Sequence, residues 1–213
     1  MSGPAWHLRP ARLEDAPALR ELELELFPED SWSEPMLRAE IAHETRSYWI
    51  AQDTADGQDT ADGQGIAEVT MSSPPILGYA GVMVVGRTAD VQNIAVVARM
   101  RGRGLGSTLL QHLHETAAAR GADEVLLEVR ESNRGAQSLY RRFGYDPIAQ
   151  RPRYYPDGET AIVMRAELTP EAPVPSSSTT DLTGHMTGPT VTGASQDRAA
   201  GPRTTPSPQE DPR

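Results

Sequence analysis

The chain contains no cysteine, and this absence excludes several chemistries at once. Disulfide scaffolds, thiolate metal sites and thiol nucleophiles all need that residue. Aromatic residues make up only 5% of the chain, and no apolar run approaches the roughly 18 residues that a membrane-spanning helix needs. Residues 1–10 lack the apolar core of a signal peptide. We therefore expect a cytoplasmic protein with no membrane segment.

Positive charge is also scarce. Lysine and arginine together number 20 against 30 aspartates and glutamates, which gives a formal net charge of −10. General nucleic-acid binding needs a basic surface, so we expect no direct nucleic-acid partner. The acidic balance is compatible with solubility alone or with attraction to a basic partner.

Large apolar residues become rare after Leu168. Residues 169–213 are rich in proline, serine, threonine and glycine and show no hydrophobic period. Such a segment cannot bury enough apolar surface to offset its ordering entropy. The composition predicts one folded domain over residues 1–168 and a disordered tail over residues 169–213.

A hexapeptide is repeated directly, once over residues 52–57 and again over residues 58–63. Both copies read Gln-Asp-Thr-Ala-Asp-Gly, and two copies are too few for a solenoid. We interpret residues 52–75 as a low-complexity loop insertion, since surface loops are lengthened at little cost. Calcium binding by its aspartates is the alternative, although the repeat lacks the ligand spacing of an EF-hand.

Hydrophobic periodicity predicts an alternation of strands and helices in the second half of the domain. Strands are expected at 6–9, 47–51, 77–85, 89–97, 124–130, 145–154 and 161–168. Helices are expected to begin near Asp15, Ser33, Gly104 and Asn133. The Glu-Leu alternation at residues 21–26 also fits a strand. The order favours a mixed sheet covered by helices.

A glycine-rich turn joins the apolar strand ending near Val97 to the helix that begins near Gly104. Glycines let the backbone approach a ligand closely, and a helix start presents unpaired N–H groups with a positive dipole end. Arg101 and Arg103 add charge suited to a diphosphate. The segment lacks the Gly-Lys-Ser/Thr of a P-loop and the three-glycine dinucleotide spacing. On these residues alone, a diphosphate site and an ordinary glycine turn both remain open.

Four motifs in order resemble the GNAT acetyltransferases. They are Arg101-x-x-Gly104-x-Gly106, Leu127-Glu128-Val129-Arg130-x-Ser132-Asn133, Leu139-Tyr140-x-x-x-Gly144-Tyr145 and Arg153-Tyr154-Tyr155-Pro156-x-Gly158. The first matches the (Gln/Arg)-x-x-Gly-x-(Gly/Ala) signature of that superfamily. The other three resemble its ribosomal-protein-alanine acetyltransferase (RimI) members. Two positions depart from the usual pattern: Val97-Ala98-Arg99-Met100 replaces His/Asp-Pro-x-Tyr, and Ser107 replaces a common arginine.

This resemblance implies an α/β (α+β) GNAT fold, with a mixed, mostly antiparallel sheet of about seven strands and four flanking helices. The sheet is expected to splay where acetyl-CoA binds. The residues assigned to acetyl-CoA are Ile94, Ala95, Val96, Arg101, Gly102, Arg103, Gly104, Leu105, Gly106, Ser107 and Asn133. The Val96 N–H is expected to polarise the thioester carbonyl, and no metal is expected.

The resemblance also implies the catalytic pair, with Glu128 as general base and Tyr140 as general acid. An α-amino group is mostly protonated at neutral pH, so a base is needed before it can attack. Taken without the resemblance, Glu128 fits a strand-end ion pair and Tyr140 a core tyrosine. His112 and His114, on the helix after the glycine turn, are expected on the surface rather than in catalysis.

For such an enzyme the expected acceptor is the N-terminal α-amino group of a protein, most typically the N-terminal alanine of a small-subunit ribosomal protein. Tyr154 and Tyr155 would bind this peptide, and Phe27, Pro28 and Trp32 could form the opposite wall. Two alternatives remain: a GNAT that acetylates lysine side chains or a small amine, and a non-catalytic acyl-CoA-binding module.

Overall fold

The computed structural model describes residues 6–28, 30–54 and 74–168. The predicted tail 169–213 and most of the predicted insertion 52–75, including nearly all of the repeat, lie outside the described residues. The strands are β1 (Trp6–Pro10), β2 (Arg46–Asp53), β3 (Ile76–Val85), β4 (Thr88–Val96), β5 (Glu124–Arg130), β6 (Asp146–Arg151) and β7 (Ala161–Glu167). The α-helices are α1 (Ala16–Leu26), α2 (Glu34–Ala42), α3 (Leu105–Ala119) and α4 (Arg134–Arg142). None of these helices is long and apolar enough to cross a membrane.

The strands form a seven-stranded sheet in the order β1-β2-β3-β4-β5-β7-β6. Each neighbouring pair is antiparallel except β4 and β5, which run parallel. A parallel pair needs a crossover connection, and here α3 supplies it. The prediction of a mixed, mostly antiparallel sheet with four helices is therefore confirmed.

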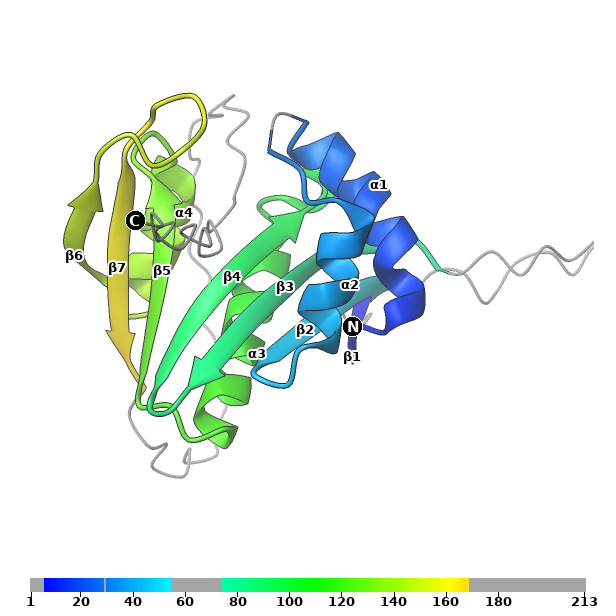
Figure 1. Cartoon of the computed structure of the whole chain (residues 1–213), viewed down its shortest axis with the longest axis horizontal. Coiled ribbons are helices and arrows are strands. Elements are labelled where there is room, and N and C mark those ends of the chain that lie inside the picture. The colour runs from blue at the N-terminus through cyan, green and yellow to red at the C-terminus, as the bar shows by residue number, and fades with distance from the viewer. Residues whose placement is uncertain (1–5, 29, 55–73, 169–213) are drawn as a thin grey trace, which may run out of the picture.

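Two helical layers enclose the sheet. Figure 1 shows α1 and α2 on one face of β2–β4, with α3 behind those strands and α4 behind β5. The helix over residues 16–26 buries Leu19, Leu22 and Leu26, so its helical period prevails over the alternation that also fitted a strand. Ser33 caps α2 through a bond from the Met36 N–H at 3.4 Å.

The sheet splays between β4 and β5. These strands pair only over Thr88–Asp90 and Glu124–Leu126. Among the described residues, the remaining length of β4 has register partners on the β3 side alone. Figure 1 shows the two strands meeting at one end and diverging toward the other. The predicted splay is thus present, and it opens beside the glycine turn that follows β4.

A buried polar chain fixes α1 to the central strands. The Tyr79 hydroxyl on β3 donates to the Glu23 carboxylate on α1, and Asn93 Nδ2 on β4 donates to that hydroxyl at 2.6 Å. The second Glu23 oxygen accepts the Trp32 backbone N–H at 2.7 Å. A buried polar group without a partner costs free energy, so these hydrogen bonds are favoured. They hold the α1–α2 connection over one face of the sheet.

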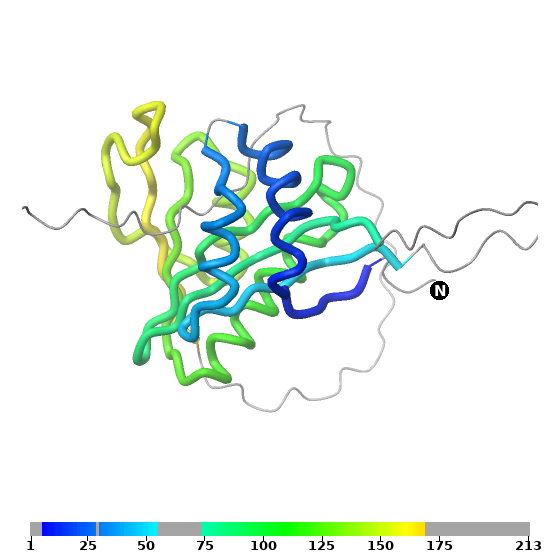
Figure 2. Tube along the Cα trace, turned by 45° about the vertical axis from the view of Figure 1, so that its right-hand side comes forward, coloured from blue at the N-terminus to red at the C-terminus, as the bar shows by residue number. Residues whose placement is uncertain are grey.

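Two connections lie at the same end of the sheet, on either side of the splay. Figures 1 and 2 both place the α1–α2 connection and the β6–β7 loop at the end where β4 and β5 diverge. The last two strands form a hairpin that projects beyond the helical layers (Figure 2). These two connections, which are distant in the sequence, therefore flank the end of the sheet where β4 and β5 diverge (Figure 1).

Candidate active site

The backbone of β4 offers hydrogen-bonding groups to the gap. The Val97 N–H donates to the Leu77 carbonyl of β3 at 3.0 Å. Since alternate residues of a strand direct their N–H and C=O groups to opposite sides, Ile94 and Val96 direct theirs away from β3 and toward the gap. There the Val96 carbonyl accepts a long bond from Arg101 Nε at 3.4 Å. The side chains of Ile94, Ala95 and Val96 are buried.

The glycine turn before α3 has the conformation that its composition predicts. Gly102 and Gly104 have φ angles of 72° and 89°, in the region that side chains with a Cβ disfavour. The Thr108 N–H bonds the Gly104 carbonyl at 3.0 Å and closes the first turn of the helix. The N–H groups of Leu105, Gly106 and Ser107 precede it, and N–H groups at this place in a helix have no carbonyl partner within the helix. A diphosphate fits these donors.

The other predicted acetyl-CoA residues have mixed surroundings. Arg103 is exposed beside the turn and Arg101 is half buried, whereas Leu105 is buried in the core. Asn133 is buried, and its side-chain oxygen caps α4 by accepting the Ala136 N–H at 3.0 Å. The structure therefore gives Asn133 a structural function, and its contact with acetyl-CoA stays a prediction.

Glu128 lies on the face of the sheet that α1 covers. Tyr79 contacts Glu23 of α1, and the β3–β4 register places Met83 and Asp90 on the same face as Tyr79. Asp90 in turn pairs with Leu126 of β5, so Leu126 and Glu128 share that face.

The Glu128 side chain is only 13% exposed and is paired with Arg151 of β6, whose Nη1 lies 2.8 Å from Oε1. Burial raises the pKa of Glu128, Arg151 opposes that rise, and the neighbouring Asp90 adds to it. A carboxyl group whose proton affinity exceeds the ordinary value is better suited to take a proton from an amine.

Tyr140 lies on the opposite side of the sheet from Glu128. Gly106 of α3 lies against Leu139 of α4 and against Val96, whose side chain points away from the face of Tyr79. Tyr140 is 1% exposed on α4, with its ring centroid 5.7 Å from that of Tyr145. The two predicted catalytic residues thus lie on opposite faces of the sheet, Glu128 on the side of α1 and Tyr140 on the side of α3 and α4 (Figure 1).

Tyr154 and Tyr155 lie in the β6–β7 loop rather than in a strand. The expected strand 145–154 is wrong at both ends, since β6 covers only Asp146–Arg151. Arg153 has a φ of 55°, and the N–H groups of Tyr154 and Tyr155 both donate to the Glu159 carbonyl, at 3.0 and 3.2 Å. The chain turns here, at the end of the sheet where β4 and β5 diverge (Figure 1).

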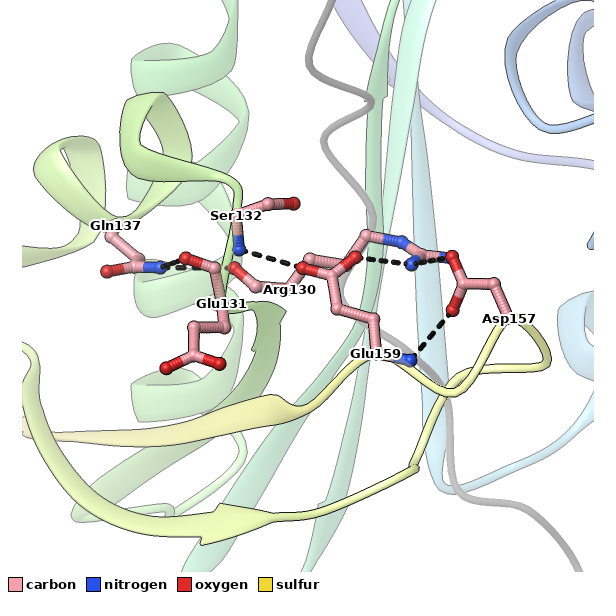
Figure 3. A network of polar contacts seen from close by, with 6 residues as sticks. All are labelled: Arg130, Glu131, Ser132, Gln137, Asp157 and Glu159. Atoms are coloured by element: carbon pink, nitrogen blue, oxygen red, sulfur yellow. Dashed lines mark hydrogen bonds and ion pairs between the residues drawn. The ribbon is translucent and has the colours of Figure 1, made fainter.

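Arg130 fastens this loop to β5. One guanidinium nitrogen bonds Asp157 and Glu159, each at 2.7 Å, and the second Glu159 oxygen accepts the Ser132 N–H at 2.7 Å. Figure 3 shows these residues, with Gln137 of α4 donating to the carbonyls of Arg130 and Glu131 on the other side. The loop, the end of β5 and the start of α4 therefore form one connected unit.

Tyr155 occupies the inner side of that unit. Its ring lies under Arg130, and burial raises the pKa of its hydroxyl, so the group stays protonated. Among the described residues this buried hydroxyl has no hydrogen-bond partner. A buried donor left without a partner is unusual and suits a hydrogen bond to a bound molecule.

Comparison with known proteins agrees with this geometry. The model of the acetyltransferase (GNAT) family matches residues 16–145. The chain belongs to this family. It is an acetyl-CoA-dependent N-acetyltransferase, and members of the family use acetyl-CoA as the acetyl donor. The predictions of the family, the fold and the reaction type are confirmed.

Individual relatives point in the same direction. The N-alpha-acetyltransferase RimI of Mycobacterium tuberculosis is 33% identical over 159 residues, which are 72% of this chain and 87% of that protein. The Escherichia coli ribosomal protein bS18-alanine N-acetyltransferase is 42% identical over 94 residues, which are 43% of this chain and 64% of that protein. A crystal structure of the Escherichia coli ribosomal-protein-S18-alanine N-acetyltransferase has a TM-score of 0.63 at 26% identity and covers 79% of this chain and 97% of that chain.

Several site residues were not found by sequence reasoning. Arg130 stands two positions after Glu128, so strand alternation could have placed it on the same face. The sequence around Arg151 and Asp90 gives no sign that they lie near Glu128, because only the order and register of the strands in the folded sheet bring them there. His112 and His114 are half buried rather than on the surface, and His114 Nε2 bonds the Tyr145 hydroxyl at 2.8 Å.

Proposed function

We propose that the protein acetylates the N-terminal α-amino group of a protein in the cytoplasm, with the N-terminal alanine of a small-subunit ribosomal protein as its acceptor. The observation that carries this proposal is the gap between β4 and β5. The glycine turn follows β4, which borders this gap, and Glu128 lies on β5, on the face of the sheet that α1 covers. Relatives with RimI-type names support the same acceptor class.

Acetyl-CoA supplies an activated acetyl thioester, and the described residues fit it. The N–H groups at the start of α3 would hold its diphosphate, and the gap-facing groups of Ile94 and Val96 would align its amide-bearing arm. The residues proposed to contact it are Ile94, Ala95, Val96, Arg101, Gly102, Arg103, Gly104, Leu105, Gly106, Ser107 and Asn133.

The chain's own residues would move two protons and stabilise one charge. Glu128 takes a proton from the acceptor ammonium group, which leaves a neutral amine able to attack. The Val96 N–H donates to the carbonyl oxygen as negative charge develops there. The Tyr140 hydroxyl gives a proton to the departing sulfur from the opposite side of the sheet.

The β6–β7 loop supports a peptide rather than a small amine as acceptor. Tyr154 and Tyr155 are proposed to bind the first residues of the peptide, because the Tyr155 hydroxyl, which has no partner in the part of the chain that the structure describes, is available to a peptide group. Across the gap, the α1–α2 connection is fixed through Glu23 and Trp32. A fixed wall on each side favours an extended chain end over a compact solute.

The test is acetyl-CoA turnover on short peptides that differ only in their first residue. We expect a mass gain on peptides with a free N-terminal alanine and none when that end is blocked. Peptides with a blocked end and an internal lysine, and free polyamines, serve as competing acceptors. Glu128→Gln should lower turnover on the preferred peptide.

Two outcomes would contradict the proposal. Acetylation restricted to lysine side chains or polyamines would favour the other enzyme class. Binding of CoA without turnover on any acceptor, unchanged in Glu128→Gln, would indicate a non-catalytic acyl-CoA-binding module.

A further inference from the structure

The proposed base is occupied by a cation of the protein itself. Arg151 reaches Glu128 across β7, which lies between the strands that carry the two residues. The Arg151 side chain is 51% exposed, whereas that of Glu128 is 13% exposed. Arg151 is also the last residue of β6, an edge strand in which each residue is exposed. A half-buried carboxylate is thus neutralised by a guanidinium that has free access to solvent.

The groups around Glu128 make this single cation important. Asp90 of β4 pairs with Leu126, two residues before Glu128, and raises the pKa of Glu128, while β7 offers the apolar Val163 as its register partner. Burial raises the pKa of Asp90 as well, and Arg151 lowers the pKa of both carboxyls. Tyr155, in the adjacent loop, is a neutral phenol. One exposed guanidinium therefore compensates two half-buried carboxylates.

Building on the proposed function, we propose that Arg151 is a positioning residue that holds, in the free enzyme, the place at Glu128 that the acceptor ammonium group takes. An ammonium group carries the same charge and donates the same kind of hydrogen bond to a carboxylate. When the acceptor enters, the guanidinium moves out to solvent and the ammonium replaces it. The ammonium group takes the place of the guanidinium, so a positive charge stays beside Asp90 and Glu128 throughout the exchange.

The exchange changes what Glu128 does next. The proton then passes from the acceptor nitrogen to the Glu128 carboxylate, so that the ammonium becomes an amine and the carboxylate becomes a carboxylic acid. With Arg151 gone, burial and Asp90 both favour the protonated carboxyl. Acceptor binding thus turns a well-paired carboxylate into a better proton acceptor at the time when a base is needed.

This exchange predicts a split between two pH profiles in Arg151→Gln. The profile of kcat/KM reports the free enzyme, in which the variant lacks the counter-charge, so its acidic limb should move up by about half a pH unit or more. The profile of kcat reports the acceptor complex, in which no guanidinium contacts Glu128 in either protein. The acidic limb of kcat should therefore stay in place. At pH values above both acidic limbs, KM for the peptide should be lower in Arg151→Gln than in the wild type, because no cation of the protein competes with the acceptor for Glu128.

Two variants serve as controls. Arg151→Lys keeps a cation and should resemble the wild type. Arg165→Gln removes another half-exposed arginine of the same sheet, which pairs with Glu124 and Glu167 instead, and should leave both profiles unchanged.

A direct titration separates this proposal from the proposed function. The side-chain carboxyl carbon of Glu128 is followed by NMR in the free protein and assigned by its loss in Glu128→Gln, so no acceptor is needed. We expect it to titrate at higher pH in Arg151→Gln than in the wild type, even if no peptide is acetylated. An unchanged titration would overturn the proposal. Equal movement of the kcat and kcat/KM limbs would also overturn it, because Arg151 would then remain on Glu128 throughout turnover.

Discussion

The guanidinium carbon of Arg130 lies 3.9 Å from the centroid of the Tyr155 ring. The same guanidinium bonds two carboxylates of the β6–β7 loop, so the strand that carries Glu128 also sets the position of the proposed peptide-binding ring. Arg130 and Glu159 are both partly buried, whereas Asp157 is 46% exposed, so the pair with Glu159 is the one less screened by solvent. The loop proposed to bind the acceptor is therefore attached to the sheet by contacts within the protein itself.

Arg130→Gln should raise KM for the peptide acceptor on the order of tenfold, with a smaller change in kcat and in CoA affinity. The reason is that glutamine cannot bridge Asp157 and Glu159 or lie as a cation against Tyr155. Steady-state kinetics and CoA calorimetry measure the two effects. Arg87→Gln, which breaks an exposed pair with Asp123, is the matched control and should change neither. A fall in kcat with KM unchanged would contradict this positioning function.

Glu128→Gln should lower kcat by about 10²- to 10⁴-fold while CoA affinity stays within about twofold. The amide keeps the shape of the side chain but cannot take a proton. In the wild type the rate should fall as acid protonates Glu128, and because burial raises its pKa this limb should lie above the ordinary carboxyl range. The limb should be missing in the variant. Equal losses of turnover and of CoA binding would refute the assignment of Glu128 as base.

Tyr140→Phe should lower kcat strongly and change the free energy of unfolding by only about 1 kcal/mol, since the buried ring is retained and one hydroxyl is lost. Turnover and urea denaturation measure the two quantities. Tyr145→Phe is the matched control, because it removes a hydroxyl from the adjacent ring of the same cluster and should leave kcat close to the wild-type value. If both variants lose activity equally, Tyr140 acts through packing and not as an acid.

Gly104→Ala should weaken CoA binding by about tenfold, because an alanine at a φ of 89° costs about 1–2 kcal/mol and would pull the turn out of shape. Gly106→Ala is the comparison. An added Cβ there would meet Leu139 at 3.7 Å and Val96 at 4.0 Å, which are ordinary contacts. It should bind CoA much as the wild type does. Calorimetry that finds the reverse order would move the diphosphate site away from this turn.

The protein should lose stability in mild acid through His114. Burial lowers the pKa of His114 from 6.5 to about 4. Between these two values the unfolded chain binds a proton at His114 that the folded protein does not bind. The contribution of neutral His114 to the free energy of unfolding is complete above pH 6.5. It declines by about 3 kcal/mol as the pH falls toward about 4. Urea denaturation at neutral and acidic pH should show a smaller difference in His114→Gln. An equal difference in both proteins would exclude His114 as the cause.

The sequence allowed the element order and the glycine turn of the candidate site to be predicted, since both depend on local signals. Strand β5 was expected at 124–130 and lies at Glu124–Arg130, because a short, mostly apolar run is a local strand signal. The glycine turn could be predicted because positive φ angles favour glycine and because the apolar period of a helix begins directly after it. Arg151 and Asp90 were missed because their meeting with Glu128 depends on which strands become neighbours. His114 was misplaced because a histidine on a helix gives no sign that Tyr145 will bury it.

The divergence of β4 from β5 bears on how the protein behaves when its acetyl donor is scarce. A strand side with unpaired N–H and C=O groups is a template on which another chain can assemble. The amides of a bound CoA arm would occupy that side of β4 and close it. Cofactor supply would then govern the solubility of the enzyme as well as its rate, and dilute CoA would be a protective additive during concentration and storage.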